Sequence, residues 1–352
     1  MTGNLPGDVK DDRTKDHKGL VSILVCSRDR RKELEELIHS LKTMDTQYAY
    51  EIVVVEETDK PLPIEGVNYV SHPVANRGIP YARNLALSHA EGEILVFLDD
   101  DCLIHDQWLD KLLAPFEDHS VVGVQGGVTV PPNTNSVGWV EAIVGVPGGN
   151  IRRVLEAEGR TVETREISTL NCAYRRWAVD KVGGFESHLK ITGEDYVLAK
   201  EVCRLGRCLF VPDAMVSHQA RGKLGLIWRW FIRRGRADID VIRATGWTSA
   251  KYQWLIRSSL FLKLLVLVLL CFGFPDLAVP FGLVAMLGYI TSQYTRYYGP
   301  WKKSRISVRP YILLPLVKFV MDLAIDAGRI IELWSKDRTS TSSREDPWSA
   351  QG

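Results

Sequence analysis

The stretch Ile94-Leu95-Val96-Phe97-Leu98-Asp99-Asp100-Asp101 decides the fold: five apolar residues, typical of a buried strand, end in three consecutive carboxylates. Three adjacent anions repel one another, so they need a neutralising partner. A divalent cation with oxygen ligands, Mg2+ or Mn2+, meets this need and can also bridge a diphosphate. Open parallel sheets bind ligands just beyond the carboxyl ends of their strands, which supports a functional site here. A solvated acidic turn is the alternative that the run alone leaves open.

The segments around this strand alternate between strand and helix. Apolar runs predict strands at 21–25, 52–55 and 67–71, and helical spacing predicts helices at 32–41 and 79–90. Such alternation predicts a parallel sheet covered by helices on both faces. A dinucleotide-dependent dehydrogenase of this outline needs a G-x-G-x-x-G turn after its first strand. The turn at 26–30 reads Cys-Ser-Arg-Asp-Arg and has no glycine, which disfavours that class.

Composition limits the partners. The 352 residues include 44 basic and 43 acidic side chains, a formal net charge of +1, so nothing global favours nucleic acid. The six cysteines form no C-x-x-C pair, which indicates reduced thiols on the cytoplasmic side rather than a disulfide framework or a zinc site. Residues 1–18 do not resemble a signal peptide, and we expect a disordered lead-in there. The Ser/Thr-rich segment 335–352 is expected to be a disordered tail.

The C-terminal third is apolar. Two stretches, 255–274 and 277–290, predict a transmembrane helical hairpin over 255–293, with a buried helical pair in a soluble protein as the alternative. Basic residues flank the pair on both sides. By the positive-inside bias, this predicts a multi-pass protein of the cell membrane whose catalytic domain is cytoplasmic. Residues 294–334 are expected to form a basic loop and then an interfacial amphipathic helix over 311–331.

Eight blocks of sequence carry a resemblance to a known family. In chain order they are SRDR at 27–30, EIVVVEE at 51–57, NRGIPYARN at 76–84, DDD at 99–101, NCAYRR at 171–176, GGFE at 183–186, GED at 193–195 and PDAMVSH at 212–218. In this order, residues 19–235 resemble a family 2 glycosyltransferase. The resemblance implies a GT-A domain, a Rossmann-like α/β fold for nucleotide-diphospho-sugar transferases, which we place at 19–246. It further implies metal-dependent, inverting transfer of one sugar from a nucleoside-diphosphate sugar to an acceptor hydroxyl.

The resemblance also implies roles for single residues. Asp101 and His218 are expected to bind Mn2+ or Mg2+, and the catalytic acids are Asp195, as general base, and Glu194. The residues expected to bind the nucleotide sugar are Ser27, Arg28, Glu56, Arg83, Asp99 and Asp100, and those expected beside the sugars are Asn171 and Gly193. Taken alone, His218 reads as an ordinary histidine and Asp195 as an acid at a helix N-terminus. The family often has aspartate where Glu56 stands, which leaves the nucleotide open, and Asp100 has no assigned role.

Processive polysaccharide synthases are the nearest alternative. They carry a Q/R-x-x-R-W element, but Leu226 occupies its first position here and only Arg229-Trp230 remains. Together with two expected spans instead of a channel, this favours non-processive transfer. Trp228, Trp230 and Phe231 with Arg233 and Arg234 predict an interfacial helix whose arginines face lipid phosphates or a polyprenyl diphosphate, and an ordinary packing helix is as compatible.

The acceptor is therefore expected to be a lipid-linked saccharide or a cell-envelope glycan. A noncatalytic nucleotide-sugar-binding membrane scaffold is the alternative from another class. Such a scaffold would have lost either the D-x-D element or the acid of Gly193-Glu194-Asp195, and both are present.

Overall fold

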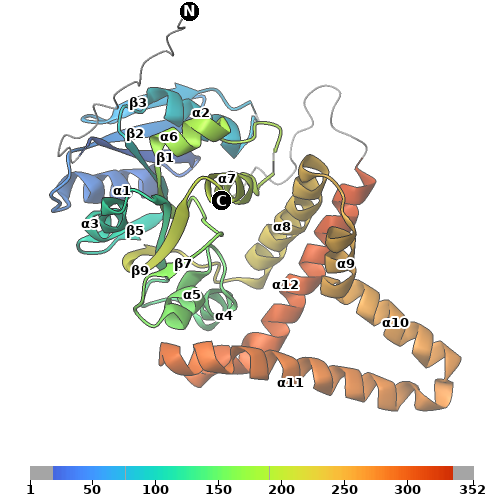
Figure 1. The fold of residues 1–352 in the computed structure, drawn as a ribbon. Helices are drawn as coiled ribbons and strands as arrows, with labels where there is room; N and C mark the ends of the chain where they lie inside the picture. The colour runs from blue at the N-terminus through green and yellow to red at the C-terminus, as the bar shows by residue number, and fades with distance from the viewer. Residues whose placement is uncertain (1–18, 76, 190, 336–352) are drawn as a thin grey trace, which may run out of the picture.

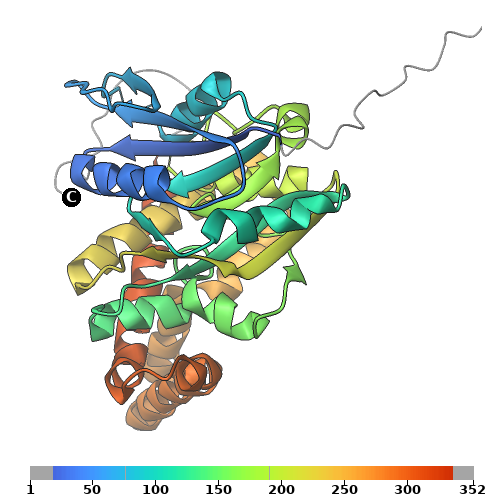
Figure 2. The same ribbon diagram turned by 90° about the vertical axis from the view of Figure 1, so that its left-hand side faces the viewer.

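The computed structural model describes residues 19–335 except 76 and 190. The predicted lead-in at 1–18 and all but the first residue of the predicted tail lie outside the described residues. An α/β body is joined to a C-terminal helical part, and two long helices of that part project away from the body (Figure 1; Figure 2).

A nine-stranded sheet forms the centre of the body. Its first four strands pair in parallel in the order β3-β2-β1-β4, with β1 at Val21–Arg28, β2 at Tyr50–Glu57, β3 at Asn68–His72 and β4 at Ile94–Asp99. The order continues β8-β6-β9-β5, and β7 pairs with β9; these strands are β5 Cys102–Ile104, β6 Val121–Thr129, β7 Val162–Glu163, β8 Asn171–Arg175 and β9 Arg207–His218.

The sheet is mixed, which corrects the prediction of a parallel sheet beyond β4. Strand β8 runs antiparallel to both β4 and β6. The alternation of strands and helices that predicts parallel pairing ends at β4. Only Asp100 and Asp101 separate β4 from the next strand, β5. Parallel neighbours need a crossover of about a dozen residues or more, and this connection has no room for one.

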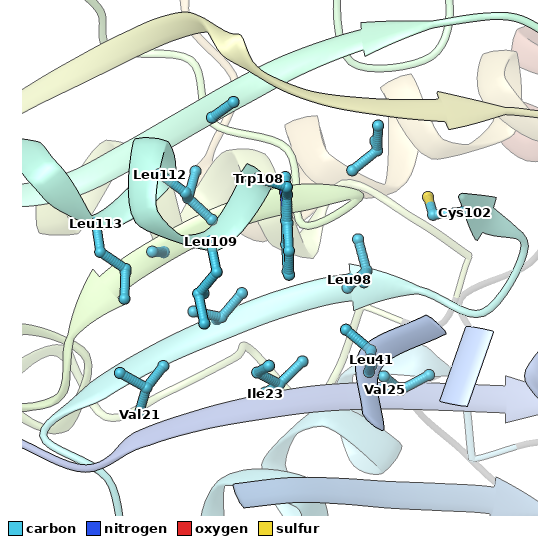
Figure 3. Close-up of a cluster of buried hydrophobic side chains, with 14 of the residues drawn as sticks. Val21, Ile23, Val25, Leu41, Leu98, Cys102, Trp108, Leu109, Leu112 and Leu113 are labelled. Carbon is cyan, nitrogen blue, oxygen red and sulfur yellow. The ribbon is translucent and has the colours of Figure 1, made fainter. Parts of the chain in front are cut away.

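Helices cover both faces of the sheet. Side chains alternate along β1, so Val21, Ile23 and Val25 face one layer and Leu24 faces the other. The first layer contains α1 (Arg31–Thr43), α3 (Trp108–Leu113) and the 3-10 turn η1 (Ala114–Glu117); the second contains α2 (Ile79–His89), α6 (Arg176–Val182) and α7 (Glu194–Val202). Figure 3 shows the leucines of α3 directed at the strand that carries Val21 and Ile23.

A second core joins the body to the C-terminal helices. It is built from α4 (Ser136–Val144), α8 (Leu224–Thr245) and α12 (Val308–Trp334), with α5 (Asn150–Ala157) beside α4. Helices α8 and α12 approach so closely that a Cβ on Gly235 would lie 1.9 Å from the Ile325 carbonyl oxygen. Only glycine fits such a crossing. The buried face of α12 shows that this helix packs against α8, where the sequence predicted an interfacial helix.

The predicted hairpin is not confirmed, because its first limb is bent. Helices α9 (Ser249–Ser258) and α10 (Leu260–Gly273) meet at 63°, and the 3-10 turn η2 (Pro275–Leu277) leads into α11 (Ala278–Ser304). The 14 residues of α10 measure about 21 Å, less than the roughly 30 Å of a bilayer core. By length and composition, one helix, Pro275–Ser304, is apolar enough to cross a membrane, or two if the bent pair counts as one span.

The break between α9 and α10 has a local cause. The Ser259 hydroxyl accepts a hydrogen bond from the Leu262 amide at 3.1 Å, which caps the start of α10. The buried carboxylate of Asp326 on α12 accepts from the Ser259 hydroxyl at 3.1 Å and from the Phe261 amide at 2.8 Å. These bonds fix the elbow to the helical core, so 255–274 does not form one straight helix.

Candidate active site

A cleft of about 2940 Å³ opens at the carboxyl ends of β1 and β4. It passes the start of α7 and follows α8 to α9, so Asp99, Asp195, Arg229 and Trp254 all line it. The parallel register brings the strand ends together, with Cys26 opposite Asp99 and Arg28 opposite Glu57. The cleft therefore lies where ligands of open α/β sheets bind.

The middle carboxylate, Asp100, is tied into the protein. It is buried; its Oδ2 accepts from the Ser27 hydroxyl at 2.7 Å, and its Oδ1 lies 3.2 Å from Arg30 Nη1. Burial raises the pKa of Asp100 to about 6, although Arg30 and Ser27 favour its charged form. Asp100 thus fastens the loop after β4 to the end of β1, and the same bond engages the Ser27 hydroxyl that was expected to contact the nucleotide.

The outer carboxylates form a cluster with His218. One ligand atom from each of Asp99, Asp101 and His218 lies within 4.8 Å of the others. Asp101 Oδ2 accepts from Arg30 at 2.6 Å, whereas Asp101 Oδ1 and His218 Nδ1 are buried without a hydrogen-bond partner among the described residues. Burial lowers the pKa of His218, although Asp101 opposes this, and keeps its ring neutral near pH 7. Two carboxylates and a neutral imidazole fit a divalent cation.

Arg83 on α2 connects this cluster to the start of α7. Its guanidinium is buried, makes a short ion pair with Glu194 and lies 3.6 Å from Asp99 Oδ1. Burial lowers the pKa of Arg83, but Glu194 and Asp99 outweigh it and raise the pKa overall. The Asp99 side chain is 37% exposed, on the side of the cleft. Desolvation of its carboxylate raises the pKa of Asp99, although the charge of Arg83 opposes this rise. The Arg83 guanidinium, which was predicted to bind the nucleotide sugar, therefore contacts the carboxylates of Asp99 and Glu194.

The loop before α7 places Asp195 on the cleft wall. Gly193 has φ of +102°, and a Cβ there would lie 2.4 Å from Val241 Cγ2 of α8, so glycine is required. Glu194 turns inward to Arg83, and burial raises its pKa although Arg83 opposes this. Asp195 remains at the cleft, where its Oδ1 accepts from the Tyr196 amide at 2.8 Å.

The end of β2 differs from the prediction by one residue. Glu56 is buried, accepts from Arg31 at 3.1 Å and from the Tyr69 hydroxyl, and lines a small neighbouring pocket. Glu57 lines the main cleft instead, with Arg28 Nη1 at 3.4 Å from its Oε2. Successive side chains of a strand point to opposite sides, so Glu57 faces the main cleft and Glu56 faces the neighbouring pocket.

Asn171 has a structural role in place of the predicted sugar contact. It is fully buried, and its Nδ2 donates to the carbonyl oxygens of Gly127 and Ala214 at 2.8 and 2.9 Å. Its Oδ1 accepts from the Trp108 indole at 2.9 Å. These bonds hold β8 to β6, β9 and α3, and they use the polar atoms of the side chain.

Three residues that line the cleft were not predicted from the sequence. Arg30 partners two of the adjacent carboxylates, Glu57 lines the cleft, and Arg221, three residues after His218, is held by the buried carboxylate of Glu141 and lies over the Trp230 ring. Arg30 and Glu57 stand inside quoted blocks, so the blocks contained the signal. The Glu141 to Arg221 pair joins positions 80 residues apart and left none.

The fold, with its cleft at the carboxyl ends of β1 and β4, is of the GT-A class. The family described as Glycosyl transferase family 2 matches residues 22–183. This part of the chain is similar to that family, and the family match together with the curated relatives supports a glycosyltransferase enzyme.

Two relatives and one solved structure illustrate the match. "Glycosyltransferase AglE" of Haloferax volcanii is 26% identical over 234 residues, which cover 63% of this chain and 73% of the relative. "Glucosyl-dolichyl phosphate glucuronosyltransferase" of the same organism is 26% identical over 225 residues, covering 56% and 69%. The mannosyltransferase PcManGT from Pyrobaculum calidifontis, solved with GDP-Man and Mn2+, is 19% identical with a TM-score of 0.55, covering 92% of this chain and 89% of that one. The last likeness concerns the fold and confirms the predicted GT-A architecture.

Proposed function

We propose that this chain is an inverting, non-processive glycosyltransferase that uses Mn2+ or Mg2+ and moves one sugar from a nucleoside-diphosphate sugar to an acceptor hydroxyl. One observation carries the proposal. The cluster of Asp99, Asp101 and His218 shares a cleft with Asp195, and Arg83 bridges the two ends by contacting Asp99 and Glu194.

Asp101, His218 and Asp99 would hold the metal, because Asp101 Oδ1 and His218 Nε2 face each other at 3.3 Å in this cluster and the imidazole is neutral. When bound, a divalent ion supplies charge neutralisation for a departing diphosphate. Arg28 and Glu57 would contact the donor nucleotide, while Ser27 and Asp100 hold the loop that carries Asp99 and Asp101. PcManGT is solved with GDP-Man and Mn2+, which supports a donor and metal of this kind.

Asp195 would act as the general base. In the proposed step, Asp195 takes the proton of the acceptor hydroxyl, the hydroxyl oxygen bonds to the anomeric carbon, and the bond from that carbon to the diphosphate oxygen breaks with its electron pair. One displacement inverts the configuration. Glu194 would position this base, since its own carboxylate is committed to Arg83.

The acceptor would be a lipid-linked or cell-envelope glycan at a membrane. The cleft ends at α9, which leads into α10, and large apolar side chains of α10 and α11 such as Phe261, Leu269 and Val284 are exposed. A relative whose name specifies glucosyl-dolichyl phosphate supports this acceptor class. Basic residues on both flanks of 255–293 support a multi-pass anchor with the catalytic domain on the cytoplasmic side.

The direct test combines binding and turnover in the full chain. Thermal shifts with UDP-, GDP- and dTDP-sugars should appear with one nucleotide and should require Mn2+ or Mg2+, and chelation should abolish transfer. Asp195→Asn should keep the donor-induced shift and lose turnover by at least about 100-fold, the usual scale of a general base. A variant with unchanged turnover, or a wild type without any metal-dependent shift, would overturn the mechanism.

A further inference from the structure

The arginines of α8 meet two different environments. Arg236 and Arg243 face α12 and pair with the buried carboxylate of Glu332 at 3.0 and 3.3 Å. Arg229 and Arg234 are exposed, line the catalytic cleft and form no ion pair in the part of the chain that the structure describes. One turn beyond Arg234, Asp238 is bonded to Arg329 at 2.7 and 2.9 Å. The cleft side of α8 therefore presents the exposed guanidinium groups of Arg229 and Arg234, and Asp238, which interacts electrostatically with Arg234, is already bonded to Arg329.

This charge lies on the acceptor side of the proposed base. Arg233 Nη2 donates to the Ile191 carbonyl at 2.8 Å, which ties α8 to the loop that leads into Gly193 and Asp195. Figure 1 shows α8 between the α/β body and the projecting helices, and the cleft continues along it to Trp254 on α9. The two ends of the cleft carry different charged groups: carboxylates lie at the strand ends, and guanidinium groups lie along α8.

We propose that Arg229 and Arg234 form an anion subsite for a phosphate or diphosphate on an amphiphilic acceptor. Guanidinium groups match phosphate oxygens in geometry and charge. The apolar chain of such an acceptor leaves the cleft past Trp254 and meets the exposed face of α10, including Phe261 and Leu265. The carboxylates at the strand ends are already paired with Arg30 and Arg83, so the exposed guanidinium groups of α8 are the positive charge that the cleft offers to an acceptor phosphate. This inference rests on the proposed function and names the chemistry of its acceptor.

The test measures binding of a polyprenyl monophosphate and of the matched neutral polyprenol to the full chain in detergent micelles. Arg229→Gln and Arg234→Gln should each weaken the phosphate lipid by about tenfold, as expected for loss of one charge-assisted hydrogen bond, and leave the polyprenol unaffected. Arg257→Gln is the matched control, because Arg257 is an exposed arginine of α9 outside the cleft. Equal loss for phosphate lipid and polyprenol would overturn the proposal, because it would report packing alone.

A second arm separates the acceptor from the donor as the source of the phosphate. The same variants are titrated with UDP and GDP in the presence of Mn2+, and their nucleotide affinity should stay at the wild-type value. Loss of nucleotide affinity with full lipid affinity would assign the arginines to the donor and overturn the proposal, as would no loss of either. A wild type that binds no nucleotide with metal would contradict the proposed function, whereas Arg229-dependent lipid binding would still be measurable.

Discussion

Arg83→Met tests whether one buried guanidinium holds the start of α7 against the donor end of the cleft. Arg83 pairs with Glu194 and lies 3.6 Å from Asp99, and both it and Glu194 are buried. Methionine keeps much of the apolar stem beside Phe185, whose ring lies 5.6 Å from the guanidinium carbon. The variant therefore removes the charge and leaves Glu194 unpaired in a nearly dry site.

Breaking one side of a buried ion pair costs about 3–5 kcal/mol in the free energy of unfolding. For a domain of this size, about 2–4 °C of melting temperature corresponds to each kcal/mol, so the expected loss is about 6–20 °C. The sign of the pH dependence follows from Glu194. Burial raises its pKa, and without Arg83 nothing comparable opposes that rise, so the folded variant takes up a proton more readily than the unfolded chain. The loss should be largest at pH 8 and shrink as pH falls through the raised pKa.

The assay is thermal melting of the full chain in detergent at pH 8 and pH 5.5, with turnover measured in parallel. Adding Glu194→Gln to Arg83→Met removes the unpaired charge and should recover most of the melting temperature. Turnover should stay low in both, because the Arg83–Glu194 pair that anchors the start of α7, next to Asp195, is lost. If Arg83→Met melts within about 2 °C of the wild type at pH 8 and turns over normally, the reasoning about this pair is wrong.

Two further predictions concern backbone and elbow. Gly193→Ala should destabilise the fold by about 1–3 kcal/mol and reduce turnover, because Gly193 has a positive φ and a Cβ there would meet Val241. Adding Val241→Ala removes the steric contact and should recover only part of the melting temperature. Full recovery would show that φ strain is absent. Asp326→Ala should cost about 1–3 kcal/mol and expose the α9–α10 elbow to limited proteolysis, because two donors and Arg329 lose their acceptor. Asp322→Ala, which loses a pair with Lys318 one turn away, is the control and should cost about 0.5 kcal/mol or less.

The sequence predicted the helices and strands and the negative charge of the site, because both depend on residues that are close in the sequence. Strand 94–99, the helix at 79–89 and the carboxylates at the strand end follow from neighbouring residues. Side-chain partners are not local. Ser27 and Asp100 are 73 positions apart, and Arg83 and Glu194 are 111 apart, so their bonds could not be derived from spacing. Glu56 and Glu57 show a finer limit, because the face of a strand end depends on a one-residue step.

The C-terminal helices show why hydropathy predicted a continuous first span where the structure has a bend. Averaged over 255–274, the sequence is apolar enough for one span, and hydropathy gives Ser259 little weight. The effect of Ser259 depends on Asp326, 67 positions later. The Asp326 carboxylate accepts hydrogen bonds from the Ser259 hydroxyl and from the Phe261 amide. A polar residue in an apolar run is tolerated in a straight helix, but one that is bonded to a buried carboxylate on a packed helix marks a bend.

The three adjacent carboxylates do not all face the same space: Asp99 and Asp101 share the cluster with His218, whereas Asp100 does not. Asp100 turns inward to Ser27 and Arg30, and Asp99 is balanced by Arg83, so only one oxygen of Asp101, Oδ1, is left buried and unbonded among the described residues, beside a neutral His218. Two arginines thus neutralise most of the charge that first suggested a metal. A divalent ion would bind at that single oxygen and its imidazole neighbour, so Asp101→Asn should weaken metal binding far more than Asp100→Asn. Asp100→Asn should instead loosen the loop after β4.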